Sequence, residues 1–199
     1  MIESRYWRTE LREDLIWLKK HRAYGRLSEK QLVLFERRLM LVAFQVRSLL
    51  ERPKVSDRAR STEMPVLRYK KVGDRPFATT GSGWPHERFE MQRPEPAFLS
   101  ALDVCNQLIH YYWMQTWSEG KSFTFMLVFS DYMRHKWGYA FRIEDLLQLF
   151  CVFSEDSSAI VAMESEWNDR KQDYVVKKAW GLGDLQADHS LLLKPDGAA

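Results

Sequence analysis

The sequence predicts an α+β protein in which three main helices form a bundle and antiparallel strands pack on or beside it. Two observations carry this prediction. Apolar residues recur at helical spacing in much of residues 1–120, and they alternate with polar residues through most of 121–180. With 199 residues, 45% of them hydrophobic, the chain can bury a sizeable core. We therefore expect 1–120 and 121–180 to form one domain, followed by a loose tail at 181–199.

The first two helices are predicted at residues 4–21 and 28–52. The second begins with Ser28-Glu29-Lys30-Gln31, which has the form of a capping box, and Pro53 ends it. Its middle, 39–44, is apolar all round, so we expect burial on most sides. Arg47 follows directly, and a charge beside a buried stretch needs a partner or an exit to water.

Residues 53–95 are less regular, and their Gly and Pro punctuation predicts an excursion between helices, with a possible strand at Val66–Val72. A third helix is predicted at 100–117. Ser100 is its expected N-cap, with Asp103 at the third helical position. Glu119-Gly120 is expected to end it.

The last third changes to a period of two residues. Segments 122–129 and 135–143 alternate between apolar and polar side chains, which predicts a β-hairpin. A short helix is expected at Glu144–Phe153. Ile160–Trp167 and Lys171–Trp180 predict a second hairpin around Asn168-Asp169. Together these segments predict an antiparallel meander of about four strands.

Charge is distributed unevenly along the chain. Residues 1–71 hold 18 Lys/Arg against 9 Asp/Glu, whereas 72–199 hold 12 against 18. A basic half can follow a phosphate backbone, dock onto the protein's own acidic half, or bind an acidic partner. For RNA, the expected contact residues are Arg37, Arg38 and Lys54.

Cysteine usage and hydropathy bear on the compartment. The two cysteines lack CxxC spacing, the N-terminus lacks an apolar signal region, and no run of about 18 apolar residues occurs. These observations predict a protein of the reducing cytoplasm without a membrane span. No metal or other cofactor is expected. A weaker alternative places Asp131, Glu164, Glu166 and Lys171 in a metal-nuclease site, although they alternate with apolar residues as a solvated strand face would.

The most informative stretch is Asp103–His110. On a helix, Asp103, Asn106 and His110 share one face because they lie about one turn apart. A histidine flanked by an amide and a carboxylate suits proton transfer. If this helix packs against the second, Arg47 joins Asn106 and His110, and arginine suits a phosphate. The alternative is that Asn106 and His110 only satisfy polar groups inside a helical core.

At these residues the chain resembles the HEPN superfamily of helical RNA-binding and RNA-cleaving domains. The family signature is an arginine, often a following polar residue such as Asn, and then a histidine. Asn106 and His110 match the last two, but Asp103-Val104-Cys105 occupy the positions expected for the arginine. The resemblance implies an RNA-binding protein or metal-independent ribonuclease of a bacterial defence or stress system. His110, Asn106 and Arg47 would then be catalytic, with Arg47 substituting from the neighbouring helix, or the domain would bind without cutting.

The rival hypothesis is a non-catalytic module whose basic helices and aromatic sheet recognise a protein partner. A homodimer is also expected, because HEPN-like domains often pair through the histidine helix. One helix cannot turn all of its large side chains to its own core, and four surround His110 here: Tyr111, Tyr112, Met114 and Trp117. The competing account is that strands after residue 121 cover the second face within the same chain.

Overall fold

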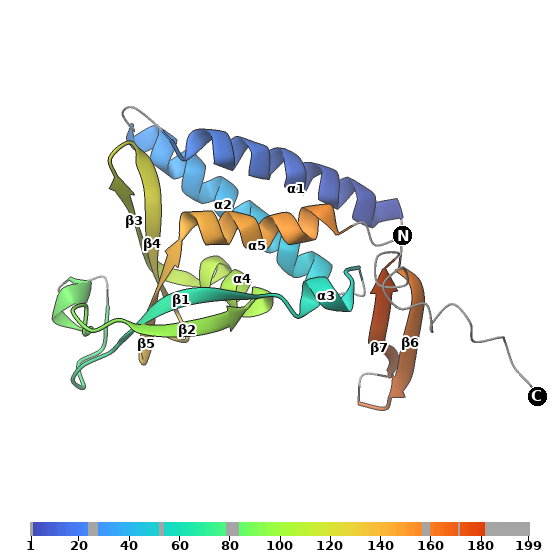
Figure 1. Ribbon diagram of the computed structural model, residues 1–199. Helices are drawn as coiled ribbons and strands as arrows, with labels where there is room; N and C mark the ends of the chain where they lie inside the picture. The colour runs from blue at the N-terminus through green and yellow to red at the C-terminus, as the bar shows by residue number, and fades with distance from the viewer. Residues whose placement is uncertain are drawn as a thin grey trace, which may run out of the picture.

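The structure, a computed structural model, describes residues 2–23, 28–51, 54–78, 84–156, 160–170 and 172–181. Helices cover one face of a five-stranded antiparallel sheet, and a two-stranded hairpin stands beside them (Figure 1). The predicted α+β class is confirmed. The predicted tail, apart from Gly181, lies outside the described residues.

The first two predicted helices are confirmed as α1 (Ile2–His21) and α2 (Glu29–Leu50). The capping box forms as predicted: the Ser28 hydroxyl accepts from the Gln31 backbone N–H, and the Gln31 side chain accepts from the Ser28 N–H. The expectation that 39–44 is buried on most sides is wrong at two positions, since Leu41 and Phe44 are 46% and 53% exposed. The cause is that α2 buries a stripe rather than its whole circumference.

The third helix is shorter than predicted. Ser100 caps α4 (Ala101–Ile109), but the helix ends with His110 as its C-cap, and Tyr111–Glu119 is strand β3. The prediction of a helix to residue 117 is therefore wrong. Aromatic and β-branched residues dominate this segment and favour strands. Gly120, with φ of 62°, makes the tight turn that lets β3 pair with β4 (Ser122–Ser130).

The five-stranded sheet includes two strands that lie outside the predicted meander. The predicted hairpin of β4 with β5 (Trp137–Arg142) is confirmed, as is the following helix α5 (Ile143–Glu155). The remaining members are β1 (Glu63–Lys70) and β2 (Glu95–Ser100), and the strand order is β2-β1-β5-β4-β3. The prediction of a single four-stranded meander is therefore wrong. The sheet has to cover the apolar residues of several helices, and strands from both ends of the excursion complete it.

The second predicted hairpin is confirmed as β6 (Ile160–Asn168) and β7 (Asp173–Gly181), but it forms a sheet of its own. Figure 1 shows it near α3 (Asp57–Arg60), which β7 contacts. Many of its described side chains are exposed. The hairpin is thus an appendage to the core rather than a part of the main sheet.

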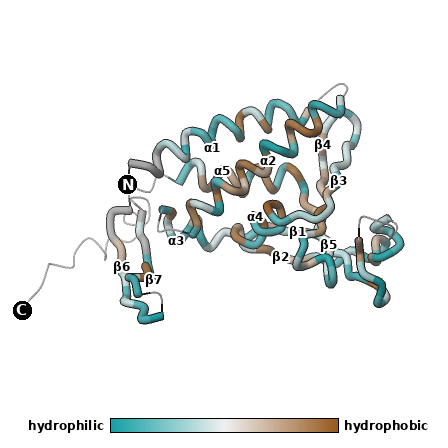
Figure 2. The backbone as a smooth tube through the Cα atoms, turned by 180° about the vertical axis from the view of Figure 1, so that it is seen from behind, coloured by the Kyte–Doolittle hydropathy of each residue, from teal (hydrophilic) through white to brown (hydrophobic). Residues whose placement is uncertain are grey.

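The main sheet is packed on both faces, but unequally. Figure 2 shows hydrophobic residues concentrated on α4 and α5, next to the sheet. One face contributes buried residues to the helical core: Val66, Met126, Val128, Tyr139 and Phe141. On the other face, Leu127, Phe129 and Ala140 pack with Phe77 and Phe89 from the excursion. The remainder of that second face stays partly open.

Gly138 on β5 permits the second, smaller core to close. A Cβ at this position would lie 2.2 Å from Cε1 of Phe129, a ring that is fully buried. The Phe129 ring therefore occupies the space above the glycine, and any larger residue would displace it.

The argument for a homodimer assumed that the residues after His110 continue the helix, and it no longer applies because they form strand β3. Tyr112 packs with the smaller core and Met114 with the helical core, while Tyr111 and Trp117 are 46% and 40% exposed. Alternation along β3 thus covers much of both faces within one chain, as the competing account held. Among the described helices, none is long and apolar enough to span a bilayer.

Candidate functional site

The packing of α4 against α2 brings Arg47 and His110 together. Cys105 on α4 is fully buried against the α2 segment that carries Arg47. One helical turn further along α4, Nε2 of His110 lies 3.1 Å from Nη1 of Arg47. His110 is exposed and Arg47 is half-buried. Two residues 63 positions apart therefore share one solvent-reachable site.

The chemistry of this contact assigns the histidine proton. A guanidinium has only donors, so Nε2 of His110 accepts and carries no hydrogen, which places the proton of the neutral ring on Nδ1. Arg47 is itself held by Glu51 one turn later, with Nε 2.7 Å from Oε1. An oriented cation thus lies beside an unprotonated imidazole nitrogen.

The other two predicted members of the face have different surroundings. Asn106 is half-buried one turn before His110, and its carbonyl accepts from the His110 N–H at 3.1 Å. Asp103 is engaged at the helix start, where its backbone N–H donates to the Ser100 hydroxyl and its carboxylate accepts from it at 2.6 Å. The cap therefore accounts for Asp103, as its position in the sequence indicated.

Three residues that the sequence did not single out complete the site. The Ser130 hydroxyl donates to the Gln107 amide oxygen at 2.6 Å, and the Gln107 amide nitrogen donates to the Tyr132 hydroxyl at 3.3 Å. The Tyr132 ring stands edge-to-face with His110, with 6.2 Å between ring centroids. In the sequence, only Gln107 could have been noticed, because it is a polar residue within the apolar stripe of α4. No comparable signal marked Ser130 or Tyr132.

Burial keeps the thiol and the phenol near His110 in their protonated forms. Burial raises the pKa of the Cys105 thiol far above its ordinary value, so the group stays protonated. Burial also raises the pKa of the Tyr132 hydroxyl, with the charge of Asp103 adding to this and that of Arg47 opposing it. At neutral pH both groups are therefore uncharged.

The residues of the metal-nuclease alternative are not gathered into a metal site. Glu164 and Glu166 lie on β6, Asp131 follows β4, and Lys171 lies outside the described residues. Within the described part of the chain, no group of three or more His, Cys, Asp or Glu side chains is placed to hold a metal ion.

The expected RNA-contact residues Arg37, Arg38 and Lys54 have different surroundings. Arg38 is half-buried, 2.7 Å from Asp14, with its guanidinium over the Trp17 ring. Nine residues correspond to two and a half helical turns, so Arg38 and Arg47 lie on opposite sides of α2. Arg37 is exposed. The ion pair with Asp14 therefore engages Arg38 on the side of α2 that faces α1.

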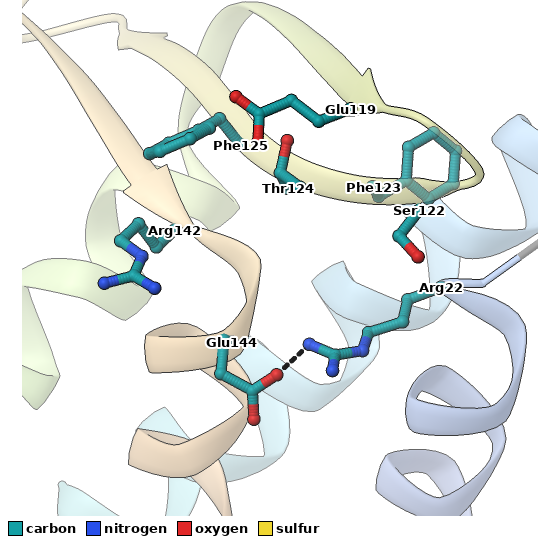
Figure 3. A pocket seen from close by; sticks show the side chains of 8 residues that line it. All are labelled: Arg22, Glu119, Ser122, Phe123, Thr124, Phe125, Arg142 and Glu144. Atoms are coloured by element: carbon teal, nitrogen blue, oxygen red, sulfur yellow. Dashed lines mark hydrogen bonds and ion pairs between the residues drawn. The ribbon is translucent and has the colours of Figure 1, made fainter.

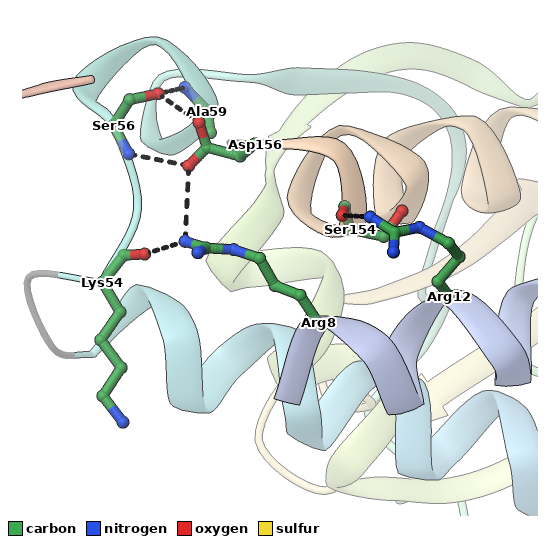
Figure 4. Close-up of polar contacts among 7 residues, drawn as sticks. All are labelled: Arg8, Arg12, Lys54, Ser56, Ala59, Ser154 and Asp156. Atoms are coloured by element: carbon green, nitrogen blue, oxygen red, sulfur yellow. Dashed lines mark hydrogen bonds and ion pairs between the residues drawn. The ribbon is translucent and has the colours of Figure 1, made fainter. Parts of the chain in front are cut away.

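Lys54 follows α2, and its carbonyl accepts from the Arg8 guanidinium (Figure 4). Part of the basic half also docks onto the acidic half of the same chain. Among the described residues, ion pairs that join the two halves include Arg8–Asp156, Arg22–Glu144 and Arg68–Glu95. Intramolecular pairing therefore accounts for some of the charge asymmetry seen in the sequence.

A separate groove of about 530 Å³ lies where α1 ends and α5 begins (Figure 3). Its charged lining is balanced, since Arg22 pairs with Glu144 while Arg142 and Glu119 lie on other sides. A second groove of about 380 Å³ lies on the open part of the sheet, lined by Leu67, Tyr69, Trp117 and Phe125 among others. Neither groove includes His110 or Arg47.

Comparison of the chain with protein-family models, with curated proteins and with solved structures finds no match. The function is therefore argued from the geometry of the site.

Proposed function

We propose that the chain is a metal-independent endoribonuclease, HEPN-like in its chemistry, of a bacterial defence or stress system. His110 is the general base, Arg47 binds the phosphate, and Asn106 contributes a nearby amide. The observation that carries the proposal is the 3.1 Å contact between Arg47 and His110 on an exposed surface. A base and a cation side by side are the minimum that RNA cleavage without metal requires.

The reaction follows from the two groups. Nε2 of His110 takes the proton of the ribose 2′-hydroxyl, and the 2′-oxygen attacks phosphorus as the bond to the 5′-oxygen breaks. Water protonates the leaving 5′-oxygen. Arg47 exchanges its donation to His110 for donation to the non-bridging oxygens, where negative charge increases. The products are a 2′,3′-cyclic phosphate and a 5′-hydroxyl.

The family resemblance covers roughly residues 4–52 and 100–117, and its proposed site residues come from α2 and from α4 with its C-cap. The signature arginine is missing from α4, and the guanidinium of Arg47 lies where it can act on the same phosphate as His110. The proposal therefore assigns to α2 the role that the family gives to a residue of the histidine helix.

The first experiment incubates the pure protein with total RNA, with and without EDTA. We expect cleavage that EDTA does not reduce and ends that carry a cyclic phosphate. His110→Ala and Arg47→Ala should each lower the rate about 100-fold, while His135→Ala, at an exposed histidine of the β4–β5 turn, should not change it. Cleavage that requires a divalent metal, or full activity of His110→Ala, would contradict the proposal.

A second candidate function is a non-catalytic protein-interaction module. The observation that favours it is the open part of the sheet, where Phe98 and Trp117 are 68% and 40% exposed. Exposed aromatic side chains of this kind are common at protein interfaces. This candidate is favoured if the protein neither binds nor cuts RNA, and if Phe98→Asp prevents association with a discrete partner protein without reducing stability.

A further inference from the structure

Tyr132 presents an aromatic ring to solvent directly beside the proposed catalytic pair. The residue is 50% exposed, and its ring lies 6.2 Å from that of His110 at an angle of 68°. A nucleotide whose phosphate contacts Arg47 and His110 places its bases within reach of this ring.

Two buried polar side chains, joined by a hydrogen bond, support the Tyr132 ring. Gln107 is 3% exposed and Ser130 is fully buried, and they connect through a hydrogen bond of 2.6 Å. Gln107 then donates to the Tyr132 hydroxyl at 3.3 Å. The phenol end is therefore anchored in the protein while a large part of the residue remains open.

Hydrogen bonds also hold the loop that carries Tyr132. The Ser130 hydroxyl accepts from the Met133 N–H at 3.3 Å, and the Arg134 N–H donates to the Ser130 carbonyl at 2.9 Å. The Arg134 guanidinium reaches the Phe77 carbonyl and lies 3.9 Å from the centre of the Tyr112 ring. A ring fixed in this way loses little conformational freedom when it binds a ligand.

From this arrangement we infer that Tyr132 is a stacking platform for an unpaired nucleobase, so that the site selects single-stranded RNA. The inference rests on the proposed function for its ligand. Bases in a duplex have both faces stacked already and cannot use the platform, whereas every unpaired base has a free face. The hydroxyl serves to anchor the ring, and the ring makes the contact.

The test is equilibrium binding to 2′-O-methyl oligo(A), which lacks the attacking hydroxyl and so reports binding without cleavage. The comparison probe is an oligomer of the same length in which every base is missing. We expect Tyr132→Leu to weaken binding of oligo(A) about tenfold, within the range of one base–aromatic stack, and to leave the abasic oligomer unchanged. Tyr132→Phe should stay close to wild type on both.

Two further variants keep the test decisive. Tyr132→Trp retains an aromatic face and should bind oligo(A) at least as well as wild type, even if the leucine variant folds poorly. Tyr174→Leu removes a 65% exposed ring from β7 and should change neither affinity. Equal weakening of both oligomers by Tyr132→Leu, or equal wild-type affinity for the two, would overturn the inference.

The outcomes separate this inference from the proposed ribonuclease. Selective loss of oligo(A) binding in a protein that does not cut RNA supports the platform and overturns the ribonuclease. EDTA-resistant cleavage by a protein in which Tyr132→Leu shows no selective loss of oligo(A) binding supports the ribonuclease and overturns the platform. Absence of binding to either oligomer by the wild-type protein overturns the platform.

Discussion

Arg8 and Arg47 both reach from an N-terminal helix to a distant part of the chain, but into opposite environments. The Arg8 side chain is 11% exposed and lies 4.0 Å from Asp156, whose side chain is 12% exposed. Arg47 instead reaches His110, which is exposed at the end of α4. The same residue type thus joins distant elements in both places, and accessibility distinguishes the two contacts.

The cluster around Asp156 uses its polar groups within the protein (Figure 4). The carboxylate accepts from the Ser56 N–H at 2.9 Å and from the Ser56 hydroxyl at 3.1 Å. Arg12 donates to the Ser154 carbonyl at the end of α5. Burial lowers the pKa of Arg8, and the nearby charge of Asp156 opposes that effect. This cluster joins α1, α5 and the start of α3, and we interpret it as structural.

The site around His110 has the opposite character. Arg47 and His110 meet at the surface, and the exposed Tyr132 ring lies beside them. Groups of this kind can exchange their present contacts for a ligand without leaving a buried charge unpaired. The comparison predicts that changes around Asp156 lower stability and changes around His110 lower activity.

The largest expected effect is on stability. Asp156→Ala removes the acceptor of the Ser56 N–H and hydroxyl, and also the carboxylate that lies 4.0 Å from the Arg8 guanidinium. We expect the free energy of unfolding to fall by about 3 kcal/mol. Urea unfolding measures it. The matched control is Asp131→Ala, whose 68% exposed carboxylate pairs with Arg134 and should contribute little. A similar small change in both variants would remove the distinction between the two regions.

His110→Ala should have the reverse profile. We expect the rate of RNA cleavage to fall by about 100-fold, the usual effect of losing a general base and equivalent to about 2.7 kcal/mol. The free energy of unfolding should change little because the side chain is exposed. Single-turnover cleavage and urea unfolding of the same preparations check both statements. A stability loss as large as that of Asp156→Ala would identify His110 as structural.

Glu36 is a half-buried carboxylate that lies apart from both regions. Burial raises its pKa, and a hydrogen bond with Thr116 works in the opposite direction. A raised folded-state pKa favours the protonated form, so stability falls as the pH rises from the unfolded pKa through the folded one. Glu36→Gln should therefore be more stable than wild type at pH 7, and the difference should shrink as the pH falls towards 4. Thermal unfolding at both pH values measures this, and the opposite trend would contradict it.

The smallest expected effect separates two neighbouring arginines. Arg37→Glu should reduce RNA affinity a few-fold and reduce the salt dependence of binding by about one phosphate contact if RNA crosses this side of α2. Arg38→Glu should act on stability instead, because it replaces the guanidinium that lies 2.7 Å from Asp14 with a like charge. Binding titrations at several salt concentrations, with unfolding curves, distinguish the two. Equal effects of both variants on RNA binding would show that the ion pair with Asp14 opens when RNA binds.

The sequence alone determined those features that depend on neighbours within a few residues. The capping box at Ser28, the cap at Ser100 and the alternation of β4 and β5 are local, so the predictions hold there. Arg47 was also recognisable as a charge beside a buried stretch. Its 3.1 Å contact with His110 agrees with the packing expected of the two helices.

The tertiary structure alone decided what depends on distant partners. Tyr111–Glu119 was predicted as a continuation of the preceding helix although its aromatic residues favour a strand, and pairing with β4 selects the strand. The hydrogen bond from Gln107, 25 residues earlier, helps to hold Tyr132 beside His110, and no local pattern encodes it. Local spacing sets the period of an element, whereas its partners depend on which apolar faces the whole chain must cover.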